Sequence, residues 1–425
     1  MPVFAVRLFY NLALFLLLPI FIPYVLWRLV MGKETAESLL AKLGLHGKEK
    51  PPKGGIWIHA VSVGEVNTAL PLAELLISRG RTVIFSVSTQ TGMSVAKSRL
   101  GGRAFVTWFP FDFPFAVDSA VARFSPSVVV LLETEIWPNF IMGSASAGVK
   151  CVVANGRISD GSFGNYKKFR WLLAPVLGKV SLFLMQTEQD AERISSLGAD
   201  KNRVRVIGNI KFDRPLPTPE GKETAMERFK LPPRARVVVF ASTHPREEDA
   251  FLDTMENLSR RGGGLFVVIA PRHVERTSDV ISICEEHHLI PNTRSSGQKC
   301  ENGSVLVLDT IGELARLYEA ADIAVMGGSF IRHGGQNPLE ASVWGKPVVF
   351  GPHMENFRDI SQKLLEGGGA KRAENQDALE EILYEWLRNP EQAKEAGEKG
   401  RQIVMNNRGA LEKTVKYLDE LLERI

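Results

Sequence analysis

Two successive series of short apolar runs, each alternating with helical stretches, constrain this chain more than any other feature. The first series lies at 56–62, 82–88, 104–109, 127–133, 151–155, 182–187 and 203–208. The second lies at 237–243, 265–270, 304–309, 323–328 and 347–351. Such alternation is typical of parallel sheets, because joining two parallel strands requires a crossover connection, usually a helix. The fold class is therefore α/β, with two doubly wound, Rossmann-like domains and a ligand cleft expected between the carboxyl ends of their strands.

A polar, proline-rich stretch at 211–223, KFDRPLPTPEGKE, separates the two series and has the composition of a linker. The length of 425 residues suits two large domains. We therefore expect an N-terminal anchor at 1–33, an N-terminal domain at 34–213 and a C-terminal domain at 214–425. After Phe357 we predict mainly helix to Ile425, and we expect the last helix to pack back on the N-terminal domain.

The N-terminal segment is strongly apolar and carries most of the excess positive charge. Its apolar stretch at 8–30 is long enough, at about 1.5 Å per residue, to cross a hydrocarbon core of roughly 30 Å. Arg28 and Lys33 lie at or just after the end of this stretch and only Arg7 precedes it, which favours a cytosolic position for the rest of the protein. We predict a membrane anchor. A buried core helix is the alternative, and a cleaved signal peptide is disfavoured because the run is too long and lacks a small-x-small cleavage site.

Composition and missing motifs exclude several classes of protein. The net charge of +4 is too small and dispersed for a dedicated nucleic-acid binder, and three cysteines without a CxxC indicate neither a disulfide framework nor a zinc site. The P-loop, G-x-G-x-x-G, G-x-S-x-G and H-E-x-x-H motifs are all absent. Asp-x-Asp is also absent, which counts against a sugar-nucleotide enzyme that holds its diphosphate through a divalent ion. We therefore predict no metal and no cofactor.

Glycine-rich turns after strands of the second series are candidate nucleotide sites. In GGSFIRHGGQNPLEA, Gly328 and Ser329 close a strand, and Pro338 and Glu340 stand at the predicted start of a helix. Backbone N–H groups there can hold a phosphate while Glu340 accepts two ribose hydroxyls. The alternative for Glu340 is a helix-capping carboxylate, because acids are enriched in first turns.

Two further strand-to-helix turns of the second series add candidates. Arg272, in IAPRHVER, offers a planar guanidinium that suits a phosphate, although it is equally compatible with an ordinary surface arginine. The turn DTIGELARLYEA places Ile311, Gly312 and Glu313 where exposed backbone groups can read a pyrimidine edge.

Acidic residues follow two strands of the first series. In HAVSVGEV, Glu65 comes directly after a strand and starts a helix, so we expect it to point into the cleft, where a carboxylate can act as a general base. The alternative is a first-turn acid that the helix dipole favours. Glu133 and Glu135, in LLETEIWPNF, are two residues apart on an extended segment and should lie on one side, where they can order a substrate or a neighbouring base.

A basic and aromatic segment, NGRISDGSFGNYKKFRWLLAP, follows another strand of the first series. Its basic residues are Arg157, Lys167, Lys168 and Arg170, and its aromatic residues include Phe163, Tyr166 and Trp171. Near a membrane this composition suits a phosphorylated, lipid-linked acceptor. A solvated basic helix face is the alternative.

Taken together, these motifs resemble a known family. HAVSVGEV, ETEIWPN, NGRIS, GNIKFD, APRH, GELARLY and GGSFIRHGGQNPLEA, with the N-terminal apolar segment, resemble the 3-deoxy-D-manno-octulosonic acid (Kdo) transferases of lipopolysaccharide synthesis. The resemblance covers nearly the whole chain, and no motif departs from it. It implies a GT-B fold, CMP-Kdo as donor, the lipid A precursor lipid IVA as acceptor, and an inverting, metal-independent transfer at the cytoplasmic face of the inner membrane.

The resemblance also assigns roles to residues. It makes Glu65 the catalytic base and places the CMP site on Pro271 and Arg272, on 311–313, and on Asn337, Pro338, Leu339 and Glu340. An inverting transfer needs one base on the attacking face, and Arg272 can stabilise the charge on the departing CMP. Lys211 is our candidate for binding the donor's carboxylate. The alternatives are a membrane-associated GT-B enzyme that uses a UDP-sugar and a non-catalytic, membrane-tethered nucleotide-binding module.

Overall fold

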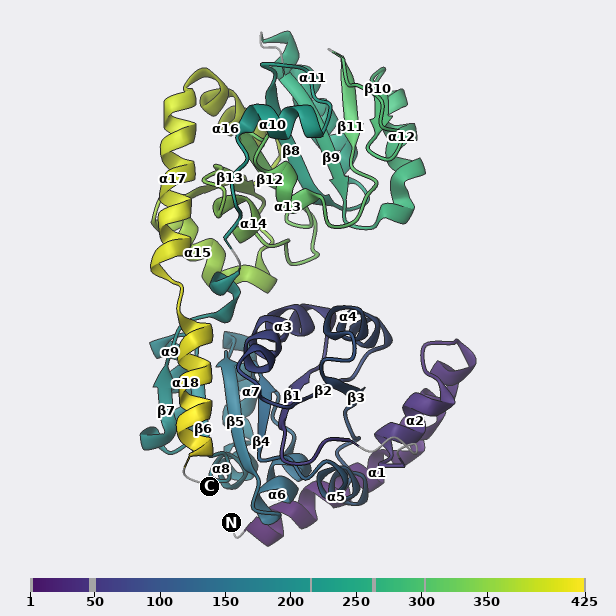
Figure 1. Ribbon diagram of the computed structural model, residues 1–425, viewed down its shortest axis with the longest axis vertical. Helices are drawn as coiled ribbons and strands as arrows, with labels where there is room; N and C mark the ends of the chain where they lie inside the picture. The colour runs from purple at the N-terminus through teal and green to yellow at the C-terminus, as the bar shows by residue number, and fades with distance from the viewer. Residues whose placement is uncertain (1–2, 46–50, 215, 262–264, 302, 424–425) are drawn as a thin grey trace. The chain divides into compact units, whose positions relative to one another are not determined.

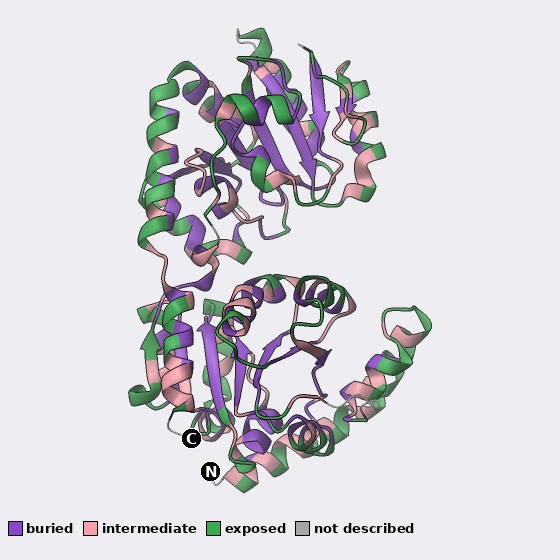
Figure 2. Cartoon of the chain, viewed as in Figure 1, coloured by how far each residue is buried: buried purple, intermediate pink, exposed green. Residues whose placement is uncertain are grey.

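The computed structural model describes the chain apart from residues 1–2, 46–50, 215, 262–264, 302 and 424–425. The chain divides into two compact units: unit 1 contains Met1–Arg214 and Arg408–Ile425, and unit 2 contains Pro215–Asn407. In each unit the strands form a buried parallel sheet with helices on both faces (Figures 1 and 2). The predicted α/β class with two doubly wound halves is therefore confirmed.

The described strands of unit 1 form a parallel sheet of order β3-β2-β1-β4-β5-β6-β7. They are β1 (Ile56–Ala60), β2 (Val83–Val87), β3 (Phe105–Trp108), β4 (Val128–Leu132), β5 (Lys150–Gly156), β6 (Leu182–Met185) and β7 (Val204–Val206). All seven coincide with predicted runs. The strand order reverses at β1 and β4, which pair directly, so the crevice beyond their carboxyl ends is the ordinary ligand position of a doubly wound sheet.

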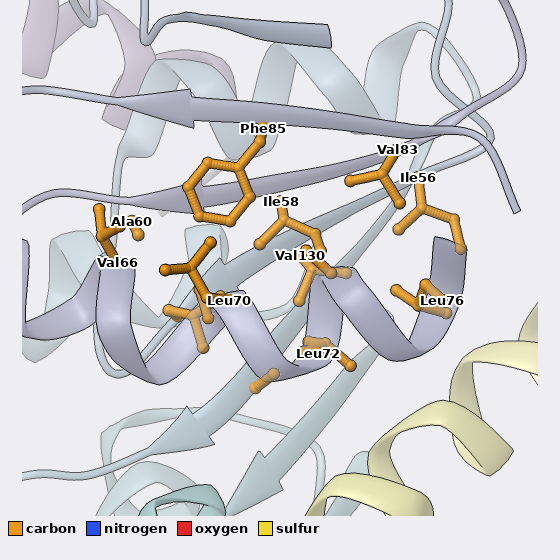
Figure 3. Packing of buried hydrophobic residues seen from close by; sticks show 14 of the residues in the cluster. Ile56, Ile58, Ala60, Val66, Leu70, Leu72, Leu76, Val83, Phe85 and Val130 are labelled. Carbon is orange, nitrogen blue, oxygen red and sulfur yellow. The ribbon is translucent and has the colours of Figure 1, made fainter. Parts of the chain in front are cut away.

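Alternate residues of β1 supply the two faces of this sheet, as the period of a strand requires. Ile56, Ile58 and Ala60 pack with α3 (Val63–Ser78), α4 (Gln90–Leu100) and α18 (Ala410–Leu422), and Figure 3 shows the α3 part of this core. Trp57 packs on the other face. That face is covered by α5 (Pro114–Phe124), α6 (Pro138–Ser146), α8 (Arg170–Leu177) and α9 (Glu188–Leu197). The remaining elements include α7 (Asp160–Lys168), η1 (Lys201–Arg203) and η2 (Ile210–Asp213).

The C-terminal helix belongs to unit 1. Val415 and Leu418 of α18 are buried in the same core as α3, and Arg79 donates hydrogen bonds to Glu412 at the surface. The turn before α18 is held to η2, because the backbone N–H groups of Gly409 and Leu411 donate to the Asp213 carboxylate.

The described strands of unit 2 repeat the same plan, in the order β10-β11-β9-β8-β12-β13-β14. They are β8 (Arg236–Thr243), β9 (Leu265–Pro271), β10 (Ile290–Thr293), β11 (Ser304–Val307), β12 (Ile323–Met326), β13 (Val348–Phe350) and β14 (Ala370–Arg372). Five were predicted. The two outermost strands, β10 and β14, were not predicted, and both are short edge strands with little apolar character. Apart from the three residues of β14, the described chain after Phe357 is mainly helical, as predicted. The order reverses at β8 and β12, which pair directly.

Helices of unit 2 complete the architecture. They are α10 (Lys222–Arg228), α11 (Glu247–Arg260), α12 (Thr277–Glu286), α13 (Leu314–Leu317), α14 (Leu339–Ser342), α15 (Arg358–Glu366), α16 (Gln376–Arg388) and α17 (Pro390–Asn406), with η3 (Val274–Arg276) and η4 (Glu355–Phe357). Apolar residues of α11, α12 and α16 cover one face of the sheet.

The apolar N-terminal segment forms one long helix, α1 (Val3–Val30), followed by α2 (Ala36–Lys42). α1 continues through Pro19 and Pro23. It is long and apolar enough to cross a membrane, and the stretch that would do so has no residue buried within the protein. Only Val6 and Val25 of the helix are buried, so the alternative of a buried core helix is excluded. The helix supports association with a membrane.

Candidate functional site

The candidate acids of unit 1 follow β1 and β4, the two strands at which the sheet order reverses. Glu65 lies in the first turn of α3, immediately after β1, and Glu133 and Glu135 follow β4. Parallel neighbouring strands end at the same edge of the sheet, so the fold brings these three acids together from two distant parts of the sequence.

Glu65 is held by hydrogen bonds at the start of α3. Its carboxylate accepts the backbone N–H of Val61 at 2.8 Å and the Ser62 hydroxyl at 3.1 Å, while the Ser62 oxygen accepts the Glu65 backbone N–H. Burial raises the pKa of Glu65, the Val61 N–H partly offsets this, and the charge of Glu133 raises it further. Ser62 caps the helix, and the Glu65 carboxylate holds the turn before it and also belongs to the acidic cluster.

Glu133 begins the loop after β4 in a strained conformation. Its φ is +55°, a left-handed value that is uncommon for a residue with a side chain and that is found at functional sites. Its carboxylate pairs with the ammonium of Lys211 at 3.0 Å. Lys211 therefore lies in unit 1, beside the acids, and its role in binding the donor's carboxylate stays a prediction.

Glu135 has the most perturbed carboxyl of this cluster. Burial and the charge of Glu65 raise the pKa of Glu135 to about 7. Burial raises the pKa of the Tyr166 hydroxyl, and the negative charge of Glu135 raises it further. A carboxyl that titrates near neutrality can exchange protons at physiological pH, so the cluster is suited to general base chemistry.

The four basic candidates of unit 1 do not form one group. Arg157 follows β5, and its backbone N–H donates to the hydroxyl of Thr134, so it adjoins the acidic loop. Lys167, Lys168 and Arg170 are exposed on α7 and at the start of α8. Tyr166 of α7 lies close enough to the acids for the charge of Glu135 to raise the pKa of its hydroxyl.

In unit 2 the loops after β8 and β12 are joined by Glu247, which the sequence analysis missed. Glu247 is 1% exposed and starts α11. Its carboxylate accepts the backbone N–H groups of His244 at 3.0 Å, Gly328 at 2.7 Å and Phe330 at 3.1 Å. The acidic first turn in THPREED is the sequence signal that could have identified it. The Gly328 N–H is therefore already bonded within the protein.

A cluster of basic side chains surrounds His244 at the same edge of the sheet. The His244 and His333 rings are 3.9 Å apart, and His273 is 6.2 Å away. Burial, then the charges of these histidines and of Arg272 and Arg276, lower the pKa of His244 to about 4. Surroundings that disfavour protonation of an imidazole favour the binding of an anion. Arg272 itself is exposed, and its backbone N–H donates to Thr243 at 2.9 Å.

The turn after β11 is organised by the Glu313 side chain. Arg294 donates hydrogen bonds of 2.9 and 3.2 Å to its carboxylate, and Thr310 donates another. These hydrogen bonds lower the pKa of Glu313. Ile311 is 87% exposed, and Gly312 has a φ of +89°, a value that glycine adopts without strain. Since the Glu313 carboxylate is occupied, the exposed backbone of 311–312 is the part available to a ligand.

The glycine-rich loop after β12 differs from the prediction in one respect. The helix α14 that it opens is only four residues long, and Pro338 is its N-cap, with Glu340 in the first turn. So short a helix provides only a weak dipole, which corrects our expectation of a helix N-terminus that holds a phosphate. The Asn337 side chain caps this turn by accepting the Leu339 N–H at 3.1 Å.

Four of the predicted donor residues in this region have buried side chains: Pro271, Ser329, Pro338 and Leu339. Ser329 is fully buried, and its hydroxyl donates to the Met326 carbonyl and accepts the Gly351 N–H. Pro271 is also buried, at the end of β9. Their contribution is to shape the edge of the sheet.

Comparisons with known proteins agree with this architecture. A family model described as 3-deoxy-D-manno-octulosonic-acid transferase matches residues 37–214, and one described as glycosyl transferases group 1 matches residues 296–403. A glycosyltransferase structure from Rickettsia africae is 15% identical, covers 88% of this chain and 100% of its own, and has a TM-score of 0.59. The fold is therefore of the GT-B type.

The similarity to characterised sequences extends over the full length. The 3-deoxy-D-manno-octulosonic acid transferase of Haemophilus influenzae is 31% identical over 98% of this chain and 99% of its own. That of Bordetella pertussis is 31% identical over 90% and 91%, respectively. Identity of this extent, across both units, shows that the chain belongs to the family of 3-deoxy-D-manno-octulosonic acid transferases and is a Kdo glycosyltransferase.

Proposed function

We propose that this protein transfers Kdo from CMP-Kdo to the lipid A precursor lipid IVA, with inversion and without a metal ion, at the cytoplasmic face of the inner membrane. The observation that carries the proposal is the acidic cluster at the β1 and β4 ends, in which Glu65 is held by two hydrogen bonds beside Glu133 and Glu135. In the reaction, an acceptor hydroxyl attacks the anomeric carbon of Kdo, Glu65 takes the hydroxyl proton, and the bond to the CMP phosphate breaks.

The charge distribution of unit 2 supports an anionic donor. CMP-Kdo carries a phosphate and a carboxylate, and Arg272 lies near His244 with His273, His333 and Arg276, the last of which also pairs with Glu248. These groups are positioned to stabilise the negative charge that the departing CMP gains. The partly buried Glu340 and the exposed backbone at 311–312 are our candidates for the ribose and the pyrimidine. The N-terminal domain thus binds the acceptor and the C-terminal domain binds the donor.

Metal independence is proposed because the sequence lacks Asp-x-Asp and offers cationic side chains in its place. The N-terminal helix supports the membrane location, since the proposed acceptor is itself a lipid.

The test is transfer of Kdo to lipid IVA by the purified full chain, supplied with CMP-Kdo, with and without EDTA. We expect wild-type transfer to survive EDTA and Glu65→Gln to lose about 10²–10⁴-fold in rate, because the amide cannot take a proton but fills the same space. CMP affinity of the variant should be unchanged. Transfer from a UDP-sugar but not from CMP-Kdo would overturn the donor assignment, and full activity of the variant would overturn the base.

A second variant tests the nucleotide site separately. Glu340→Ala should weaken CMP binding by about 1–3 kcal/mol if the carboxylate accepts ribose hydroxyls. Calorimetric titration with CMP measures this. Unchanged CMP affinity would remove Glu340 from the site.

A further inference from the structure

The N-terminal third of α1 is hydrogen-bonded to buried polar groups of unit 1. The Tyr10 hydroxyl donates to the Asp112 carboxylate at 2.9 Å, and the Asn139 side-chain amide donates to the side-chain oxygen of Asn11 at 2.7 Å. Asp112 and Asn139 are 7% and 0% exposed, and Asp112 also accepts the backbone N–H groups of Asn139 and Phe140. The helix is therefore connected to the fold by a specific network.

Aromatic contacts extend this attachment along the helix. The Phe9 ring packs on Trp171 at 5.1 Å, and the Phe21 ring packs on Phe111 at 5.2 Å. From Phe9 to Phe21 a helix rises about 18 Å. A bilayer span needs about 20 consecutive residues in hydrocarbon, whereas the parts of α1 outside the attached stretch are residues 3–8 and 22–30. Neither part can cross unless the folded body of unit 1 enters the bilayer.

The side of α1 that faces away from unit 1 is apolar and exposed. Phe4, Leu8, Leu12, Leu16 and Ile20 follow one another at four-residue intervals, and each is more than half exposed. Residues at this spacing share one face of a helix. A helix that is apolar all round is normally covered on all sides, and here the protein covers only one side. The side of α1 that unit 1 does not cover is therefore suited to contact with another apolar environment.

Other elements add apolar side chains next to the attached stretch. Phe115 of α5 is 60% exposed and connects to Phe21 through Phe113, by ring contacts of 5.8 and 6.1 Å. Phe169 and Trp171 are 56% and 41% exposed, and Trp171 contacts Phe9. The aromatic residues of α5 and of the α7–α8 junction thus continue the surface of α1 at both ends of its attached stretch.

Basic residues accompany this surface. Lys167, Lys168 and Arg170 are exposed in the same segment as Phe169 and Trp171. Aromatic side chains beside lysine and arginine are typical of the boundary between lipid tails and anionic headgroups.

We propose that α1 does not span the bilayer but lies along one leaflet, and that α1, Phe115, Phe169 and Trp171 form a single lipid-facing surface. The apolar side chains enter the leaflet to a depth of ~5–10 Å, and the neighbouring lysines and arginine contact anionic headgroups. The inference rests on the membrane association proposed above, but on neither the donor nor the acceptor. It places the acceptor-binding unit directly on the leaflet from which it would take a lipid.

A depth measurement tests this surface. Phe115→Cys, Phe169→Cys and, as control, Ser78→Cys are labelled with an environment-sensitive fluorophore in the full chain, reconstituted in vesicles of phosphatidylethanolamine and phosphatidylglycerol. Ser78 ends α3, which covers the opposite face of the sheet. Lipids that carry a quencher on the acyl chain should quench the probes at 115 and 169 but not the probe at 78. The native cysteines are buried, and unlabelled wild type checks that they do not react.

If α1 crossed the bilayer and merely tethered unit 1, the probes at 115 and 169 would stay in water, unquenched, which would overturn the proposal. A second measurement uses protease-cleavable tags at both ends of the chain in inverted inner-membrane vesicles. We expect both tags to be cleaved from outside, and cleavage of the C-terminal tag alone until detergent is added would show a span. Neither readout depends on catalysis, so failure here is distinct from failure of the proposed transfer.

Discussion

Each unit places a glutamate in the first turn of the helix that follows its central strand, yet the two residues have different surroundings. Glu247 in unit 2 is almost fully buried and accepts three backbone N–H groups from the loops after β8 and β12. Glu65 in unit 1 is partly exposed, accepts two local hydrogen bonds, and lies beside other acids. Both glutamates occupy the same position in the fold, so their different roles come from their burial and their hydrogen-bond partners. Glu247 holds two loops in place, whereas Glu65 can exchange protons.

The two sheet edges also differ in the sign of their charge. Around Glu65 and Glu135, like charge and burial raise the pKa of carboxyl groups. Around His244, burial and neighbouring cations lower the pKa of an imidazole. Two copies of one topology have thus acquired opposite electrostatics, one suited to removing a proton and the other to binding an anion.

The contrast between the two glutamates predicts different effects for their alanine variants. The Glu247 variant should lose more stability, and the Glu65 variant should lose transfer activity. Glu247→Ala should cost about 3 kcal/mol or more in the free energy of unfolding, because three buried N–H groups lose a charged acceptor. Glu65→Ala should cost about 1 kcal/mol, because it removes two partly exposed local hydrogen bonds, while abolishing transfer. Denaturant unfolding of both variants, with the transfer assay on the folded fraction, measures the difference. Equal stability losses would contradict the distinction between the two acids.

The pH dependence of transfer tests the electrostatic difference between the two units. A base works deprotonated, so a raised pKa means that the rate rises with pH through the raised value and is lost as pH falls below it. Because the charge of Glu133 raises the pKa of Glu65, Glu133→Gln should move the acid limb of kcat/KM to lower pH. A profile from about pH 5.5 to 9 measures this, and an unmoved limb would show that the coupling does not reach the base.

Much of the fold could be predicted, because the buried central strands carry continuous apolar runs. The strands missed, β10 and β14, contain polar residues such as Asn292 and Lys371 and lie at sheet edges, where pairing on one side suffices. Glu65, Glu133 and Glu135 could be proposed as a group because topology brings the ends of β1 and β4 together. Periodicity thus predicts central strands and the residues that follow them.

The hydrogen-bond and ion-pair partners of individual side chains could not be predicted in the same way. Glu247 reads as an ordinary first-turn acid, and only the fold shows that the loop after β12 supplies two of its three donors. The pairing of Lys211 with Glu133 likewise joins residues far apart in sequence. Side-chain partners of this kind depend on the packing of loops, for which a single sequence offers no periodic signal.

The ion pairs of the two units provide the smallest predicted effect. The Lys211 ammonium pairs with the Glu133 carboxylate at 3.0 Å. Arg294 donates hydrogen bonds to the Glu313 carboxylate from two nitrogens and so orients the turn at 311–312. Arg294→Lys keeps the charge but loses the paired geometry, so CMP affinity should fall by roughly two- to fivefold, the equivalent of about 0.5–1 kcal/mol for one hydrogen bond. Arg316→Lys, at the exposed pair with Glu220, is the matched control and should leave affinity unchanged. An equal loss in both variants would mean that unit 2 responds to arginine removal in general, and that the Glu313 turn has no special role in holding the nucleotide.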